Sequence, residues 1–558
     1  MPKKIKRPAQ KSQKSSDRTA KSPPSTTSSS LNYYWITLGI IIFFISLLRF
    51  RQMNIPLERD EGEYAYIGKL LLNGTAPYTN AYTMKLPGTS AMYAFFMMFF
   101  GHSGAGIHFG LILVNIATMI FLFLAFRKLF NPGVGLFSAA VFGMMALSPT
   151  VLGFAAHATH FIIFFVSIAL FFLSRFYENK KWITAFLTGL MFGLAFLMKQ
   201  QAVFFILFGG IAILMSGWLD KPVKVKQILL NASAYSGGVI IPYALLVLML
   251  KAAGAFDKFW FWTVDYAGKY ATGLSMSEGI KELTTRFKPI WLEFPFFWIF
   301  FFAGIFLTFL SKFTMKQKLT AILFTLFAFL TICTGFYFRR HYFIAFLPAI
   351  GLLAAIAVDY INSLIPKFSE KGAFSFLPVI LFGFAGIFAV SKNKDFYFNS
   401  TPNEISKKQY GNNPFIESGE IAKYIKAHSD PTDKIAILGS EPQICFYADR
   451  LSATGYIYTY PLVEAQPYNE KMQEEMISEI EKSNPKYFVY CLISASWLVK
   501  PGVPDSIFNW VNPYTNRNYQ LTGVADIYND QTIYKWDDEA TTYQPKSPQH
   551  IMIYRRKG

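Results

Sequence analysis

The sequence has few charged residues, few cysteines and no glycine-rich nucleotide loop. Asp, Glu, Lys and Arg make up 16% of its 558 residues, against about 25% in an average soluble domain, and its mean hydropathy is +0.30. This composition excludes the disordered, collagen-like and small disulfide-rich classes. The three cysteines lack metal-ligand spacing, and Cys445 and Cys491 are either a disulfide or two buried thiols. No glycine-rich loop follows a predicted strand, so a nucleotide ligand is not supported.

Positive charge is present in excess, but only in one part of the chain. A net charge of +19 would suggest a nucleic-acid partner for a soluble protein. Residues 392–558 carry −2, however, and residues 1–391 carry +21, so the positive charge coincides with the apolar runs. This pattern is typical of a membrane protein, and we expect no nucleic-acid partner.

Eleven apolar stretches approach the length of about 20 residues that a helix needs to cross a bilayer. They predict a polytopic α-helical membrane domain over residues 33–391, surrounded by membrane lipids. Residues 1–32, basic and then rich in Ser, Thr and Pro, are predicted to be a disordered cytoplasmic tail. The predicted spans are 33–50, 105–126, 133–154, 158–174, 182–198, 201–218, 228–250, 291–311, 319–338, 342–358 and 373–391.

The short loops predict the orientation of the spans. With the N-terminus in the cytoplasm, five basic loops lie inside, and two long loops, 51–104 and 251–290, lie outside, as the positive-inside rule requires. The apolar run 88–101 is too short to span and is predicted to lie in the membrane interface; as a span it would reverse everything after it. We expect the protein to lie in the cell membrane (the inner or plasma membrane). An odd number of spans then places residues 392–558 on its extra-cytoplasmic side.

The composition changes abruptly at residue 392. Residues 435–439 and 487–491 are typical of short buried strands, and residues 414–427 and 469–482 have helical periodicity. We therefore predict a small extra-cytoplasmic α/β domain over residues 392–558.

Three carboxylates, Asp60, Glu61 and Glu63, lie at the start of the first outer loop. Acidic residues in the first turn of a helix offset its positive end, and Tyr64 and Ile67 continue at helical spacing, so a structural role is one interpretation. The other is catalytic, because partial desolvation at the membrane face would raise the pKa of a carboxyl toward that of a useful base.

Several cations are predicted on the same side of the membrane. Lys85 precedes a Pro-Gly turn and suits a phosphate, although a lysine that snorkels to the interface is the alternative. Lys199, between two spans, is either a turn residue or a cation that faces an outer cavity. The run Arg339-Arg340-His341-Tyr342 suits a bidentate phosphate contact, or anchors the chain to lipid headgroups.

His157 and His160 have i, i+3 spacing, which places two imidazoles on one helical face. Such a pair can ligate a metal. Without a matching carboxylate nearby, however, two hydrogen-bonded interface residues are the more common arrangement.

These motifs resemble those of a known group. Asp60-Glu61 resembles the Asp-Glu motif of the GT-C glycosyltransferases, most similarly the protein O-mannosyltransferase, aminoarabinose transferase and lipopolysaccharide galacturonosyltransferase relatives. The segment Lys85-Leu86-Pro87-Gly88 is similar to their Lys-Pro-Pro-Gly/Leu element, with Leu86 in place of the first proline. Residues 339–342, followed by Phe346-Leu347-Pro348, resemble the Arg/His-Tyr…Pro segment of a late span. The likeness covers residues 33–391 and a C-terminal domain of a kind that some members carry.

The resemblance implies a glycosyltransferase that moves a sugar, with inversion, from a polyprenyl phosphate to a lipid, protein or glycan acceptor at the outer face. It implies Asp60 as the general base and Glu61 as a helper or alternative base. Lys85, Arg339 and Arg340, with His341 and Tyr342 beside them, would bind the donor phosphate. Some relatives use a divalent metal near the acidic pair and others do not, so the metal stays open.

A transporter or flippase for a lipid-linked sugar, and a receptor with an outer ligand-binding domain, are the rival classes. A transporter predicts polar residues within the spans and inverted repeats, which the sequence does not show. A receptor gives no reason for acids followed by a cation–Pro–Gly turn.

The topology is directly testable. We expect a reporter that is active only in the cytoplasm to be silent when it is fused after Ser400, because an odd span count and basic inner loops place this residue outside. An active fusion would show that residues 88–101 cross the membrane and would remove the basis for an outer-face site.

Overall fold

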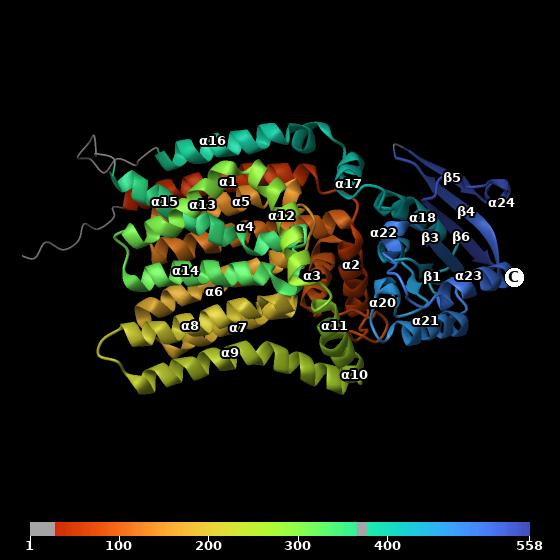
Figure 1. The fold of residues 1–558 in the computed structure, drawn as a ribbon, viewed down its shortest axis with the longest axis horizontal. Helices are drawn as coiled ribbons and strands as arrows, with labels where there is room; N and C mark the ends of the chain where they lie inside the picture. The colour runs from red at the N-terminus through yellow and green to blue at the C-terminus, as the bar shows by residue number, and fades with distance from the viewer. Residues whose placement is uncertain (1–27, 365–376, 530) are drawn as a thin grey trace, which may run out of the picture.

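The computed structural model describes residues 28–364, 377–529 and 531–558. A bundle of long helices and a smaller C-terminal domain lie end to end along the longest axis of the molecule, with helices α2 (Arg59–Leu72) and α3 (Gly88–Phe100) near their junction (Figure 1). Most of the predicted basic tail lies outside the described residues. Its last part, from Ser28, belongs to the first helix, α1.

The helices of the bundle match the predicted spans in order. Their bounds are α1 Ser28–Arg51, α4 Gly104–Leu129, α5 Pro132–Met145, α6 Ala158–Asn179, α7 Trp182–Met198, α8 Val203–Leu219, α9 Val225–Ala252, α13 Pro295–Leu310, α14 Met315–Ile332, α15 Leu347–Leu364 and α16 Leu377–Lys392. Seven helices in the described part of the chain are long and apolar enough to cross a membrane, or eight with one bent pair; α5, α7 and residues 380–392 are shorter apolar helices. The fold is thus a polytopic helical membrane fold, and the number of eleven spans stays a prediction.

Two predicted spans differ from the helices observed: one helix ends earlier than expected and another begins later. Both differences lie near the junction of the bundle and the C-terminal domain. Helix α5 ends at Met145 rather than near residue 154, and residues 146–157 form an irregular loop with a short turn, η1 (Pro149–Val151). The chain also breaks between α12 (Met276–Glu293) and α13, which meet at 108°. Pro295 at the first turn of α13 explains the break, because proline cannot continue the preceding helix.

Short helices cover the end of the bundle that faces the C-terminal domain. Helix α3 (Gly88–Phe100) has 13 residues, which is too short to span. The bounds of the others are α2 Arg59–Leu72, η2 Gln200–Ala202, α10 Phe256–Trp260, η3 Phe261–Tyr266, α11 Ala267–Ala271, η4 Thr334–Phe336 and η5 Arg340–Ala345.

The C-terminal domain is built on one mixed sheet with the strand order β2-β1-β3-β6-β4-β5. Strand β1 runs parallel to β2 and β3, whereas β6 pairs antiparallel with β3 and β4, and β4 with β5. Its strands are β1 Lys434–Leu438, β2 Leu451–Ser452, β3 Tyr487–Leu492, β4 Tyr519–Ile527, β5 Thr532–Trp536 and β6 His550–Arg556. Its helices are η6 Asp395–Asn399, α17 Pro402–Tyr410, α18 Phe415–Ala427, α19 Gln443–Ala448, α20 Tyr460–Val463, α21 Asn469–Ser483, α22 Ser494–Trp497, α23 Ser506–Asn518 and α24 Asp538–Thr542. The α/β prediction is confirmed, and Cys445 and Cys491 are free, buried thiols.

Glycines let two membrane helices approach closely. A Cβ atom added at Gly189 of α7 would lie 2.1 Å from the carbonyl oxygen of Tyr235 on α9, and one at Gly238 of α9 would lie 2.2 Å from the carbonyl of Phe186 on α7. Small residues at such a contact allow the backbones to pack directly, which is a main source of helix association in membranes.

This contact supplies a matched pair of variants. We expect Gly238→Ala to lower the thermal unfolding midpoint in detergent, because its methyl group would force α7 and α9 apart. Gly237→Ala is the control: a Cβ there meets nothing within 4 Å, and alanine favours a helix over glycine by about 1 kcal/mol. Equal midpoints for the two variants would contradict the proposed packing.

Candidate active site

Helix α2 carries the acidic cluster and lies at the junction of the two parts of the molecule (Figure 1). Glu58 caps it: its side chain accepts a hydrogen bond from the backbone N–H of Glu61, and the Glu61 side chain accepts one from the backbone N–H of Glu58. This reciprocal capping box satisfies two N–H groups at the helix start. The structural interpretation of the acidic cluster therefore holds for Glu61, and Asp60, between the two capping residues, is left to face other partners.

Asp60 is bound on one oxygen and open on the other. Its Oδ1 atom lies 2.7 Å from Nζ of Lys85 and accepts a hydrogen bond of 2.9 Å from the hydroxyl of Tyr458. Its Oδ2 atom lies 4.0 Å from Nδ1 of His157. Burial by itself raises the pKa of Asp60, but the positive charge of Lys85 and its hydrogen bond to the carboxylate outweigh burial and hold the pKa well below its usual range. The expectation of a raised pKa is thus wrong for Asp60, because the cation is closer than the sequence could show.

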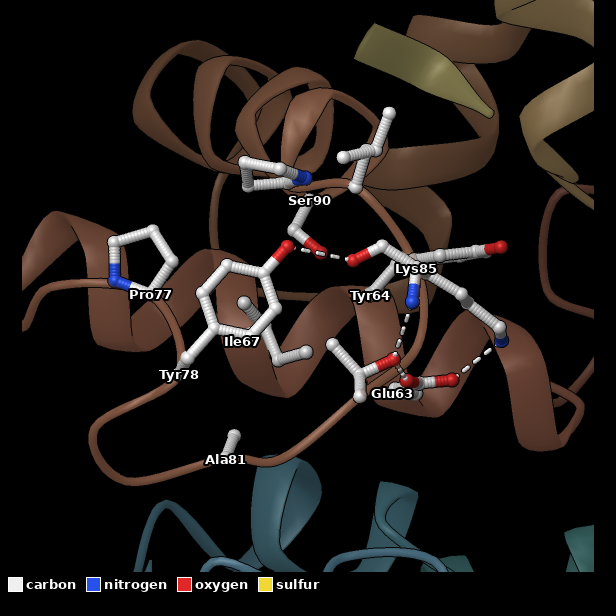
Figure 2. A pocket seen from close by; sticks show the side chains of 11 residues that line it. Glu63, Tyr64, Ile67, Pro77, Tyr78, Ala81, Lys85 and Ser90 are labelled. Carbon is white, nitrogen blue, oxygen red and sulfur yellow. Dashed lines mark hydrogen bonds and ion pairs between the residues drawn. The ribbon is translucent and has the colours of Figure 1, made fainter. Parts of the chain in front are cut away.

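Glu63 shares Lys85 with Asp60. One of its oxygens pairs with Nζ of Lys85 and the other accepts a hydrogen bond from Thr83 (Figure 2). Burial is the larger effect here and raises the pKa of Glu63 against the opposing charge of Lys85. A cavity of about 10 Å³ adjoins Glu63 and Lys85, which is about the space of one water molecule.

Glu61, for which the resemblance implies a role as helper or alternative base, does not share the surroundings of Asp60. Its Oε1 atom accepts a hydrogen bond from the backbone N–H of Ala156 at 2.6 Å and lies 2.9 Å from Nε2 of His108. The side chain is 1% exposed. Since its oxygens are engaged by Glu58, Ala156 and His108, Glu61 holds the loop before α6 against α2.

His157 and His341 form a stacked pair beside Asp60. Their ring centroids are 4.0 Å apart with planes at 16°. Burial lowers the pKa of His157 to about 4 and that of His341 well below its usual range, so both imidazoles are neutral at neutral pH. The expected i, i+3 face is wrong, because His157 is the extended N-cap residue of α6; His160 lies inside that helix and does not join the cluster.

The donor atoms of Asp60, His157 and His341 lie within 4.8 Å of one another, close enough to be candidate ligands of a divalent metal. The lone pair of an imidazole nitrogen lies in the plane of its ring. In two nearly parallel, stacked rings these lone pairs cannot converge on one ion, and Lys85 already neutralises the carboxylate of Asp60. The arrangement does not fit a bound metal.

Two cations near Asp60 have no carboxylate within 4.0 Å in the described part of the chain: Lys199 and Arg339. Nζ of Lys199 lies 4.1 Å from the ring centre of Tyr342, and the guanidinium of Arg339 lies 5.2 Å from that of Tyr337. Burial lowers the pKa of Lys199 to about 7, and the charges of Lys85 and Arg339 act in the same direction against the attraction of Asp60. Lys199, Lys85 and Arg339 therefore repel one another, and a bound anion would reduce this repulsion.

Arg340, expected beside Arg339, has another role. Its Nε atom donates to the carbonyl of Thr150 at 3.0 Å, and its terminal nitrogens donate to the carbonyls of Pro149 and Gln409. These bonds tie η5 to the turn η1 and to α17. Arg340 is thus engaged by the protein itself, and its expected role in phosphate binding stays a prediction.

Two residues near Asp60 were missed in the sequence. Glu58 could have been found, because an acid three positions before Glu61 at a helix start is a capping pattern. Tyr458 comes from the C-terminal domain, almost 400 residues along the chain, and no local pattern marks it.

Comparisons with known proteins agree with this fold. Residues 84–257 match the family model described as dolichyl-phosphate-mannose-protein mannosyltransferase. ArnT from Cupriavidus metallidurans, in a structure bound to undecaprenyl phosphate, is 12% identical with a TM-score of 0.57, over 95% of this chain and 98% of that one. The oligosaccharyltransferase AglB from Archaeoglobus fulgidus, in complex with an inhibitory peptide and a dolichol-phosphate, is 12% identical with a TM-score of 0.52, over 92% and 75%. No curated protein matches the sequence.

The membrane helices and the C-terminal sheet domain together form a fold similar to those of ArnT and AglB. The family model matches residues 84–257, less than half of the chain, and the likeness to the two solved structures at 12% identity shows a shared fold.

The unpaired charge of Lys199 should cost stability. We expect Lys199→Met to raise the thermal unfolding midpoint, because it removes a charge that lacks a carboxylate partner. The pKa of Lys199 falls from 10.5 to about 7 on folding, so the penalty is full below pH about 7 and fades as the pH rises toward 10.5. The gain should therefore be largest on the acidic side in thermal scans across this range.

The control is Lys269→Met, an exposed lysine of α11, whose replacement should change the midpoint little at any pH. A lower midpoint for Lys199→Met than for this control would show that Lys199 is paired.

Proposed function

We propose that the protein transfers a sugar, with inversion, from a polyprenyl-phosphate donor to an envelope acceptor (lipid, protein or glycan) at the outer face of the plasma membrane. The observation that carries the proposal is an ionised carboxylate, Asp60, beside two cations that lack carboxylate partners, Lys199 and Arg339, at the end of the membrane bundle. A base and an anion site side by side are what transfer from a lipid phosphate requires.

The donor phosphate would bind at Lys199 and Arg339. A phosphate that leaves the anomeric carbon takes the bonding electron pair and gains negative charge, which preorganised cations stabilise. Arg339 is exposed and offers a planar fork to two phosphate oxygens. Lys85 is already neutralised by Asp60 and Glu63, so its role is to orient Asp60 more than to bind phosphate.

Asp60 would accept the proton of the attacking hydroxyl. The acceptor oxygen bonds to the anomeric carbon from the face opposite the phosphate. The bond between the anomeric carbon and the bridging oxygen of the phosphate breaks, and the proton of the acceptor hydroxyl passes to Oδ2 of Asp60. A carboxyl with a low pKa is adequate here, because the hydroxyl becomes strongly acidic once its oxygen bonds to the sugar. The same low pKa keeps Asp60 ionised over the whole physiological range.

The similar proteins support the donor class. The ArnT structure is bound to undecaprenyl phosphate, and the AglB structure is a complex with a dolichol-phosphate. The matched family model is named for a dolichyl-phosphate sugar and covers Lys85 and Lys199. Lipid phosphates at the outer side would reach the site from the surrounding membrane, which accords with a multi-pass protein whose C-terminal domain is extra-cytoplasmic.

The test supplies purified protein with radiolabelled polyprenyl-phosphate sugars and a membrane extract as acceptor. We expect labelled product from the lipid donor and none from nucleotide sugars once lipid carriers are removed. Asp60→Asn should lower transfer by about 10²- to 10⁴-fold, the usual range for loss of a general base. Glu63→Gln, which also removes a partner of Lys85 but keeps the base, should have a smaller effect.

Product formed from a nucleotide sugar alone would exclude the proposed donor. Transfer by Asp60→Asn at the parental rate would return Asp60 to a structural role.

A further inference from the structure

A loop of the C-terminal domain reaches the candidate base. Residues 453–459, between β2 and α20, place the hydroxyl of Tyr458 at 2.9 Å from Oδ1 of Asp60. Nζ of Lys85 lies 2.7 Å from the same oxygen and 5.3 Å from the ring centre of Tyr458. Two donors therefore converge on Oδ1, one from each part of the molecule.

The loop is held at both ends. Ahead of Tyr458, the carbonyl of Gly455 accepts a hydrogen bond of 2.7 Å from the backbone N–H of Tyr82, and the backbone N–H of Gly455 donates to Glu479 at 2.9 Å. Behind it, the backbone N–H of Thr459 donates to the hydroxyl of Ser440 at 3.0 Å. Tyr458 is thus fixed relative to the domain.

The domain in turn is fixed to α2. The guanidinium of Arg59 pairs with Glu441, which is 0% exposed, and its Nε atom donates to the carbonyl of Ser440. A Cβ at Gly62 would lie 2.7 Å from Cβ of Gln443, so the backbone of α2 packs directly on α19. Arg59 precedes Asp60 in the chain, so the contact that holds the domain also fixes the start of the helix that carries the base.

We propose that Tyr458 is a positioning residue for Asp60, so that the C-terminal domain completes the active site. The proposal rests on the proposed function, in which Asp60 is the base. With Oδ1 held by Tyr458 and Lys85, the carboxylate cannot rotate, and Oδ2, on the side of His157, is the atom left to accept the proton.

The loss of this hydroxyl has a distinct signature. Without it the carboxylate gains rotational freedom and loses a hydrogen bond to its charged form, so kcat falls and the pKa of Asp60 rises. Binding of the donor, which depends on Lys199 and Arg339, stays unchanged. The substitution leaves in place the other charged and titratable groups that face Asp60. These are Lys85, His157, His341, Glu58, Glu63, Lys199, Arg339, Tyr64, Tyr93, Tyr342, Tyr410 and Tyr460.

The experiment compares Tyr458→Phe with Tyr456→Phe in the full-length protein. Tyr456 lies in the same loop, and its hydroxyl donates to Glu475 instead, so its replacement controls for a lost hydroxyl in this segment. We expect Tyr458→Phe to lower kcat by about 10- to 100-fold with an unchanged KM for the polyprenyl-phosphate sugar. We expect the acidic limb of its pH–rate profile to move up by about one pH unit. Tyr456→Phe should match the parent in both.

The outcomes separate this inference from the proposed function. If the parent transfers the sugar and the two variants behave alike, the positioning role is overturned and the function stands. If the parent does not transfer from the lipid donor, the proposed function fails, and a second measurement decides the role of Tyr458.

That measurement is the rate at which a water-soluble carbodiimide labels Asp60 at one fixed acidic pH, read by peptide mass spectrometry. The reagent reacts with the protonated carboxyl, and the Asp60 side chain is 28% exposed. Faster labelling in Tyr458→Phe than in the parent and in Tyr456→Phe supports the contact, and equal rates overturn it.

Discussion

The ion pair between Lys85 and Asp60 is the interaction on which the arrangement of the site depends. It joins the start of α2 to the turn before α3, and the negative charge of Asp60 persists beside apolar helices because this cation outweighs the cost of burial. Glu63 binds the same ammonium group, so two neighbouring carboxylates share Lys85 as a partner. The orientation of the free oxygen of Asp60 follows from this pairing.

Around this pair the chain divides its charged residues into two kinds. Arg340, Glu61 and Arg59 are engaged by carbonyls, backbone N–H groups or a buried carboxylate, and they hold the loops and the C-terminal domain in place. Lys199 and Arg339 contact aromatic rings, with no carboxylate within 4.0 Å among the residues that the structure describes. Unpaired cations of this kind do not add stability, which is why these two, rather than their neighbours, form the proposed anion site.

The C-terminal domain is part of this arrangement. Its contacts with α2 combine a buried ion pair, direct backbone packing at Gly62 and a hydroxyl on the base. An interface of this kind fixes orientation, because ion pairs and hydrogen bonds are directional whereas apolar packing is not. The same loop, 453–459, joins the sheet domain to the carboxylate of Asp60.

The sequence by itself determined the elements, because apolar length and periodicity are local properties. The order of the apolar helices, the short helix near residues 88–101 and the first strands of the C-terminal domain all follow from it. It did not predict the antiparallel half of the sheet, whose strands β4, β5 and β6 carry no long apolar run.

Only the tertiary structure decided which charge meets which. Arg339 and Arg340 are adjacent in the chain, yet one faces the site and the other binds the carbonyls of a distant loop. Asp60 and Glu61 are also adjacent, but helical geometry points them to different partners. Tyr458 reaches Asp60 across almost 400 residues. Such contacts depend on how separate elements pack, and packing is set by the whole chain rather than by any segment of it.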